Sequence, residues 1–204
     1  MRALILVDLQ YDFCPGGALA VPHGDETIAV AKRVIPHFQH VVATQDWHPR
    51  NHASFSANNP GTKVGDVIEL AGVPQVMWPV HCVQDTDGAK LHPDLAGTFE
   101  GIVQKGTDAA IDSYSGFFDN GHKKQTPLHQ WLSERWIKQV YVMGLATDYC
   151  VKFTVLDALT LAYDVKLIED GCRAVNLAAG DGERAIAEMR GAGAGIVESG
   201  AIGA

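Results

Sequence analysis

Six short runs of apolar residues recur along the chain, separated by segments long enough to hold helices. Most of these runs are continuously apolar rather than alternating, which is typical of strands that are buried on both faces of a parallel sheet. The runs cover residues 3–7, 41–44, 101–104, 139–143, 165–168 and 195–198. We therefore predict a mainly parallel sheet of six strands.

Helical patterns occupy four of the segments between these runs. They cover residues 25–38, 127–137, 148–162 and 182–190. In the second, Thr126 is placed to cap the helix and Pro127 to occupy its first position. Strands that alternate with helices in this way predict a three-layer α/β/α sandwich, a Rossmann-like architecture.

The length of 204 residues fits a single domain that spans residues 1–204, since a domain has roughly 150 residues. Within it, the region of about 46–100 is rich in Pro, Gly, Asn and His and has little periodicity. So much irregular backbone in a chain of this size indicates a system of binding loops.

Composition narrows the choice of partner and compartment. The chain has 24 acidic and 16 basic residues, and this net charge of −8 argues against nucleic acid as a partner. The apolar run at residues 3–7 is too short for a signal peptide, and no stretch reaches the ~18 apolar residues of a membrane span. Four cysteines are too few for a disulfide scaffold. We expect a cytoplasmic protein with reduced thiols; the oligomeric state stays open.

Candidate chemistry follows the predicted strands, where ligands of open α/β sheets bind. The residues in these positions are Asp8, Asp46 with His48, Lys105, Cys150 and Asp170. A single polar residue after a strand carries little information, because such loops are generally polar. An acid, a lysine, a cysteine and an Asp-x-His pair at one edge of a sheet together indicate a reactive site.

Cys150 is the candidate nucleophile. It follows Gly144-Leu-Ala-Thr-Asp-Tyr, in which Thr147 is placed to cap a helix, so that Cys150 takes the third helical position. The positive end of the helix dipole favours a thiolate there, and the free N–H groups can bind an oxyanion. The alternative is a small apolar residue that packs the helix onto the sheet.

Asp8 and Lys105 are candidate partners of this cysteine. A carboxylate at the end of an apolar strand is partly desolvated, which raises its pKa and suits it to proton transfer. A lysine beside it can hold a thiolate and a carboxylate in their charged forms. The alternatives are that Asp8 caps a turn and that Lys105 is solvated before the turn at Gly106.

Asp46 and His48 are spaced to point to one side of an extended backbone, and His52 and His81 lie in the loops that follow. Asp and His ligands suit Zn²⁺, Fe²⁺ or Mn²⁺, and three protein ligands leave positions open for substrate. Alternatively, these histidines form hydrogen bonds to the loop backbone.

Three aromatic residues, Phe13, Trp78 and Tyr114, lie near these motifs in segments without regular periodicity. Their rings can stack on a flat ligand, although aromatic side chains most often fill the core. They are candidate substrate-binding residues.

Six segments resemble the nicotinamidase/pyrazinamidase group of the isochorismatase-like cysteine hydrolases. They start at Asp8, Thr44, Trp78, Gln104, Ser113 and Gly144 and read DLQYDF, TQDWHPRNHASF, WPVHCV, QKG, SYSGF and GLATDYCV. The resemblance runs in order from about residue 3 to residue 198. It implies hydrolysis of nicotinamide, and of pyrazinamide, through a thioester.

The resemblance also implies a role for each candidate. Asp8, Lys105 and Cys150 match the catalytic triad, and Asp46, His48 and His81 match the ligands of one divalent metal ion, Zn²⁺ first among the candidates. Phe13 and Trp78 match the residues that enclose the pyridine ring, with Tyr114 nearby, and His52 is a candidate further ligand. The backbone of Ala146, Thr147 and Cys150 corresponds to the oxyanion donors, in a turn with a cis peptide bond.

One position departs from the family pattern, because Asp85 stands where glycine is more usual, so the loop after His81 is expected to differ. Two other functions stay open. One is a related amidase that acts on a different amide or carbamoyl compound, and the other is a catalytically silent protein that binds pyridines or metal.

Overall fold

The computed structural model describes residues 1–203. Its main sheet has six strands in the order β5-β2-β1-β6-β7-β8. The strands are β1 (Arg2–Val7), β2 (His40–Asp46), β5 (Gly101–Lys105), β6 (Gln139–Leu145), β7 (Asp164–Arg173) and β8 (Gly195–Val197). Every neighbouring pair in this sheet is parallel. All six predicted strands are therefore confirmed.

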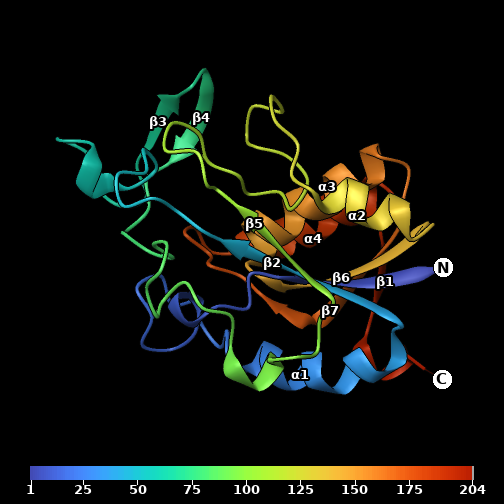
Figure 1. Cartoon of the computed structure of the whole chain (residues 1–204). Helices are drawn as coiled ribbons and strands as arrows, with labels where there is room; N and C mark the ends of the chain where they lie inside the picture. Colours follow the sequence, from blue (N-terminus) through green and yellow to red (C-terminus); the bar gives the residue numbers. More distant parts are fainter. Residues whose placement is uncertain (204) are drawn as a thin grey trace.

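Helices cover both faces of the sheet (Figure 1). α1 (Glu26–Val34) lies on one face and continues into a 3-10 turn at Ile35–His37. The opposite face carries α2 (Leu128–Glu134), α3 (Lys152–Thr160) and α4 (Asp181–Gly191). The three-layer sandwich is confirmed.

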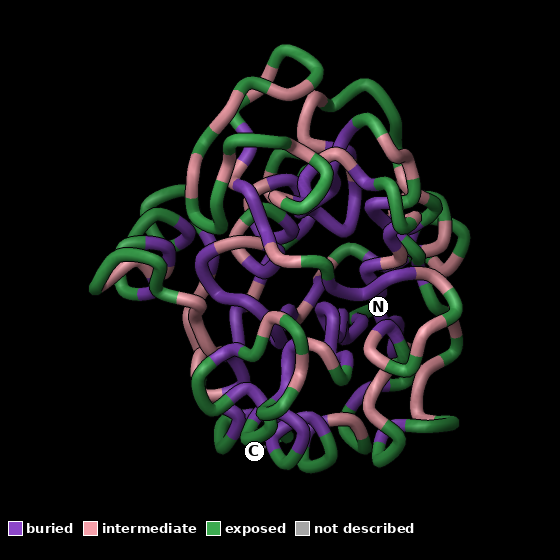
Figure 2. Tube along the Cα trace, turned by 90° about the vertical axis from the view of Figure 1, so that its left-hand side faces the viewer, coloured by how far each residue is buried: buried purple, intermediate pink, exposed green. Residues whose placement is uncertain are grey.

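The core lies where the central strands are enclosed by helices from both sides. Ala3, Leu4 and Ile5 of β1 are fully buried, which explains why this run is apolar at consecutive positions. Viewed from the end where the strands finish, buried segments lie inside a rim of exposed loops (Figure 2).

The loop region contains a hairpin that the sequence patterns did not indicate. β3 (Val67–Leu70) pairs in antiparallel fashion with β4 (Val73–Val76) in a hairpin beyond the carboxyl ends of the sheet (Figure 1). Its turn residues, Ala71 and Gly72, have φ of 54° and 86°. Two four-residue strands, one with a proline at position 74, are too short to show a period of two.

Two sequence-based boundaries need correction. The helix predicted from residue 148 begins instead as a π-helical turn, Thr147–Val151, which continues as α3. β7 extends to Arg173, so Asp170 lies within the strand and accepts a hydrogen bond from the Ser199 N–H at 2.7 Å. Asp170 is thus no part of the candidate chemistry. The predicted cap also shifts by one residue: α2 begins at Leu128 with Pro127 as its N-cap, although the Thr126 hydroxyl still accepts the Leu128 N–H at 3.2 Å.

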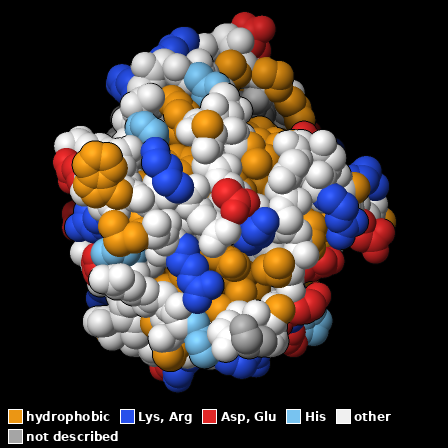
Figure 3. Space-filling model, turned by 90° about the vertical axis from the view of Figure 1, so that its right-hand side faces the viewer, with side chains coloured by type: hydrophobic (Ala, Val, Ile, Leu, Met, Phe, Trp, Pro, Cys, Tyr) orange, Lys and Arg blue, Asp and Glu red, His pale blue; other side chains and the backbone are white. Residues whose placement is uncertain are grey.

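The described residues include no helix that is long and apolar enough to cross a membrane. All four cysteines are free and buried. On the face shown in Figure 3, acidic and basic side chains are interspersed among apolar ones.

Gly144 allows the carboxyl ends of β1 and β6 to approach each other closely. It pairs with Val7 in register, and its φ of +132° is rare for residues with a side chain. A Cβ atom at this position would lie 2.1 Å from the Val7 carbonyl oxygen. The distance between the residues that follow β1 and β6 therefore depends on this glycine.

We predict that Gly144→Ala lowers the free energy of unfolding by about 3 kcal/mol or more, because the strands must separate. Gly65→Ala is the matched control: Gly65 also has positive φ, +90°, but open space around its Cβ position. That variant should lose about 1–2 kcal/mol. Thermal unfolding measures both, and equal losses would contradict the prediction.

Candidate active site

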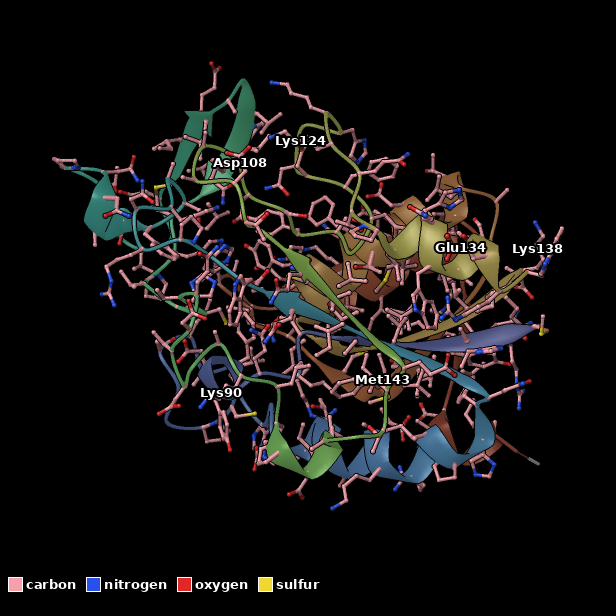
Figure 4. All side chains as sticks on the ribbon, in the orientation of Figure 1. Lys90, Asp108, Lys124, Glu134, Lys138 and Met143 are labelled. Carbon is pink, nitrogen blue, oxygen red and sulfur yellow. The ribbon has the colours of Figure 1, made fainter. Side chains whose placement is uncertain are left out.

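The candidate residues that follow four adjacent strands converge at one edge of the sheet. Asp8 follows β1, Asp46 ends β2, Lys105 ends β5 and Cys150 lies in the turn after β6. Loops enclose this edge, and Asp108 and Lys124 connect two of them through an ion pair of 2.5 Å (Figure 4). The predicted convergence is confirmed.

The Lys105 ammonium lies at the centre of this group. Its Nζ is 2.6 Å from Asp46 Oδ1, 2.9 Å from Asp8 Oδ2 and 3.3 Å from Cys150 Sγ. It also donates a hydrogen bond to the Ser113 carbonyl at 2.9 Å. The side chain is fully buried, so the alternative of a solvated lysine is excluded.

Asp8 is held in one orientation by its neighbours. The Thr44 hydroxyl donates to Asp8 Oδ1 at 2.6 Å and accepts the Asp8 N–H at 3.2 Å. Asp8 has φ of 49°, so the chain turns away from the sheet directly after β1. Oδ2, which forms no hydrogen bond with good geometry, is the oxygen that lies beside Lys105, and the Cys150 sulfur lies within 4.8 Å of an Asp8 carboxylate oxygen.

Burial raises the pKa of Asp8 to about 6, although the Lys105 ammonium opposes the shift. Burial would lower the pKa of Lys105, but the carboxylates of Asp46 and Asp8 outweigh it and raise that pKa well above its ordinary value. The lysine is therefore permanently charged, whereas Asp8 can gain or lose a proton near neutral pH.

The thiol of Cys150 differs from the prediction in both position and charge. The helical turn begins after Ala146, no side chain caps it, and Cys150 is its fourth residue rather than the third. Burial raises the pKa of Cys150 well above its ordinary value, and Lys105 opposes this only in part. The resting group is a thiol, which needs a base to remove its proton.

Asp46 connects this triad with a second cluster. While Oδ1 contacts Lys105, Oδ2 lies 3.5 Å from His48 Nε2 and 3.9 Å from His81 Nε2. All three side chains are buried, and their candidate ligand atoms lie within 4.8 Å of one another. Burial would raise the pKa of Asp46, but the Lys105 ammonium opposes burial and the pKa lies well below its ordinary value, so Asp46 stays an anion.

The orientation of the two imidazoles fits a metal ion. His48 Nδ1 donates to the Gly106 carbonyl at 2.9 Å, and His81 Nδ1 donates to the Pro79 carbonyl at 2.8 Å. Each Nε2 is thereby left with its lone pair toward Asp46, and His48 Nε2 is buried without a hydrogen-bond partner. Two imidazole nitrogens and one carboxylate suit Zn²⁺, Fe²⁺ or Mn²⁺.

Gly106 is needed for this arrangement. It has φ of +63°, and a Cβ atom there would lie 2.4 Å from the His48 ring. The glycine therefore allows the His48 ring to reach the backbone directly after Lys105.

His52 lies beside His48 but outside the group of Asp46, His48 and His81. The two rings are 4.4 Å apart, and the group that includes His52 contains His48 and Asp112 instead. His52 Nδ1 accepts the Ser54 N–H at 3.3 Å. This geometry favours three protein ligands over four.

Cys150 lines a pocket to which several aromatic side chains also contribute. Phe13, Trp78 and Tyr114 all line it, as do Tyr149 and Val175, which the sequence reasoning did not single out. Tyr149 directly precedes Cys150, and this position could have identified it as a pocket residue from the sequence alone. Phe13 and Trp78 both line this pocket, and the Phe13 ring lies 5.6 Å from the ring of His81.

Buried hydrogen bonds hold two of these aromatic walls. The Tyr114 hydroxyl accepts from Trp78 Nε1 at 3.1 Å and from Gln75 Nε2 at 2.8 Å. Gln75 lies on β4 and also donates to Asp112 at 3.2 Å. The hairpin β3–β4 thus contributes to the pocket, a role that no pattern in the sequence indicated.

The turn before Cys150 has the expected cis peptide bond, between Leu145 and Ala146. Ala146 lines the pocket beside Cys150. The N–H groups of Ala146, Thr147 and Cys150 remain the candidate oxyanion donors.

Asp85 has φ of 64°, a conformation that glycine adopts readily. The loop after His81 is also held by a hydrogen bond of 2.7 Å from the Cys82 N–H to Asp12. The backbone conformation of Asp85 is therefore one that a glycine at this position would also adopt.

Comparison with known proteins agrees with this geometry. The isochorismatase domain matches residues 2–200. A nicotinamidase from Escherichia coli (strain K12) is 53% identical over 198 residues, 95% of this chain and 92% of that protein. The structure of a nicotinamidase/pyrazinamidase from Acinetobacter baumanii superposes with a TM-score of 0.94 at 44% identity, covering 98% of this chain and 96% of that one.

A third relative carries a metal. The structure of pyrazinamidase from Pyrococcus horikoshii in complex with zinc has a TM-score of 0.80 at 39% identity and covers 97% of this chain and 98% of that one. Because the domain match spans nearly the whole sheet and both clusters of the site, this chain belongs to the isochorismatase domain family.

Proposed function

We propose that this chain is a cysteine amidohydrolase that converts nicotinamide to nicotinate and ammonia, and that also accepts pyrazinamide. The observation that carries the proposal is the buried Asp8–Lys105–Cys150 group at the end of an aromatic pocket. The 53% identical relative is a nicotinamidase, and the structural relatives include pyrazinamidases. Free cysteines are consistent with a cytoplasmic enzyme.

Phe13 and Trp78 would hold the aromatic ring of the substrate, so that its carboxamide carbon meets Cys150 Sγ. Asp46, His48 and His81 would hold one divalent metal ion, Zn²⁺ being the first candidate. Such an ion is a Lewis acid that can fix the ring nitrogen and so orient the amide.

In the first half of the reaction, Asp8 Oδ2 takes the proton of the Cys150 thiol, and the sulfur forms a bond to the carboxamide carbon. The carbonyl oxygen becomes an oxyanion, which the N–H groups of Ala146, Thr147 and Cys150 stabilise. As the C–N bond breaks, Asp8 passes its proton to the leaving nitrogen. Ammonia departs, and a thioester on Cys150 remains.

In the second half of the reaction, Asp8 again acts first as a base and then as an acid. Asp8 takes a proton from water, and the resulting hydroxide adds to the thioester carbon. The C–S bond then breaks, Asp8 returns this proton to the sulfur, and the product leaves as nicotinic acid, which releases its carboxyl proton to the solvent to give nicotinate. Lys105 stays charged throughout and stabilises whichever of its partners is the anion.

We expect Cys150→Ala to reduce ammonia release at least about a thousandfold, because no other group can form the thioester. Nicotinamide should still bind, since the aromatic pocket is unchanged, and titration calorimetry can measure this. Cys172→Ala, which removes another buried thiol, is the control and should keep nearly full activity. Turnover by Cys150→Ala would reject the proposed nucleophile.

The pKa of Asp8, about 6, predicts the acidic limb of the pH profile. Asp8 must be unprotonated to act as the base, so kcat/KM should fall about tenfold per pH unit as the pH drops below that value. Thr44→Val removes a hydrogen bond that lowers this pKa, and the limb should move to higher pH. Steady-state rates at saturating zinc test both points; a limb near pH 4, the ordinary range of aspartate, would contradict them.

Removal of the metal with a chelator should reduce kcat/KM at least about tenfold, because the amide is then poorly oriented. Added Zn²⁺ should restore the rate. His81→Ala should bind zinc more weakly than the unaltered chain, whereas His122→Ala, an exposed histidine outside the cluster, should not. Full activity in a sample shown to be free of metal would refute the orienting role.

A further inference from the structure

Gln10 has a side-chain amide that is bound on both sides to the backbone of one residue. Its Oε1 accepts the Asp46 N–H at 2.8 Å, and its Nε2 donates to the Asp46 carbonyl at 2.8 Å. The same Nε2 donates to the Ala89 carbonyl at 2.8 Å. The residue is completely buried, so these bonds do not compete with water.

The hydrogen bonds between the Gln10 amide and the Asp46 backbone take the place of a neighbouring strand at the end of β2. Pairing of β1 with β2 ends at Leu6 and Ala43, and β1 turns away at Asp8, so the end of β2 has no strand beside it on that side. Both backbone groups of Asp46 face that gap. A primary amide is the side-chain group that supplies one donor and one acceptor with the spacing of a peptide unit.

We propose that Gln10 is a positioning residue for the Asp46 carboxylate. Asp46 Oδ1 binds Lys105 while Oδ2 faces His48 and His81, so its backbone has to be held on the β1 side as firmly as on the β5 side. On the β5 side, Lys105 is its partner in register and the Trp47 N–H donates to the Lys105 carbonyl. On the β1 side, the Gln10 amide supplies the hydrogen bonds to the Asp46 backbone. The inference rests on the metal site of the proposed function.

Gln45 offers a matched control in the same place. It is also buried, precedes Asp46 directly, and donates through Nε2 to the same Ala89 carbonyl at 2.8 Å. Its side chain has no hydrogen bond to Asp46; its Oε1 instead accepts from Gln104 at 3.2 Å. Replacing either glutamine with methionine keeps the length and removes the bond to Ala89, but only Gln10→Met releases Asp46.

The experiment compares Gln10→Met and Gln45→Met with the unaltered chain by zinc affinity, kcat/KM for nicotinamide and thermal unfolding. Gln10→Met should bind Zn²⁺ about 10–100-fold more weakly and lose kcat/KM by a similar factor, as is usual when the support of a ligand is removed. Gln45→Met should stay within about twofold on both measures. Zinc affinity of the folded protein separates positioning from a general loss of stability. Equal effects of the two substitutions, or unchanged affinity in Gln10→Met, would overturn the proposal.

If Gln10→Met does not fold, Gln10→Glu is the second variant, because it can still accept the Asp46 N–H but cannot donate to the Asp46 carbonyl. A crystal structure of the folded variant tests position directly. A displaced Asp46 carboxylate supports the proposal, and an undisturbed one refutes it. Should the unaltered chain neither bind zinc nor release ammonia, the proposed function fails, and this structure still decides the role of Gln10.

Discussion

The buried ammonium of Lys105 is the constraint on which the site depends. A charge without water costs several kcal/mol unless opposite charges compensate it. Two carboxylates, a carbonyl and a sulfur surround this ammonium at 2.6–3.3 Å. Removing either carboxylate would take from the buried ammonium one of its two counter-charges. Lys105 therefore fixes where Asp8, Asp46 and Cys150 can lie relative to one another.

The sheet supplies these partners through its strand order. β5, β2, β1 and β6 are consecutive neighbours, so Lys105, Asp46, Asp8 and Cys150 follow one another along a single edge. In a parallel sheet, all strands finish at the same edge, and four residues far apart in sequence meet without long loops. Only close contact between β1 and β6 is still required, and Gly144 permits it. The metal-binding candidates are attached through Asp46, which faces both clusters.

Sequence reasoning reached the strands and the sandwich because they depend on local patterns. It reached Asp8, Lys105 and Cys150 as candidates because they follow strands, but only the family resemblance assigned them as a triad. It failed where the outcome depends on surroundings. The π-helical turn at Thr147–Val151 and the extension of β7 through Asp170 follow from tertiary contacts, not from the propensity of those residues. A cysteine near a helix N-terminus suggested a thiolate, yet burial, which no spacing reveals, outweighs that effect. The amide of Gln10 was overlooked because glutamine carries no reactive group, although its shape completes β2.

A thiol with a raised pKa can still act as the nucleophile, because what matters is the difference between the pKa of Cys150 and the pKa of Asp8. When the proton moves from Cys150 to Asp8 Oδ2, the charge of the group does not change: one anion replaces another beside the same ammonium. Lys105 is 2.9 Å from the carboxylate and 3.3 Å from the sulfur, so it stabilises both arrangements. The two groups thus titrate as one unit. Burial raises the pKa of both groups and so keeps the proton inside the site. The proton moves first from Cys150 to Asp8 and then from Asp8 to the leaving nitrogen.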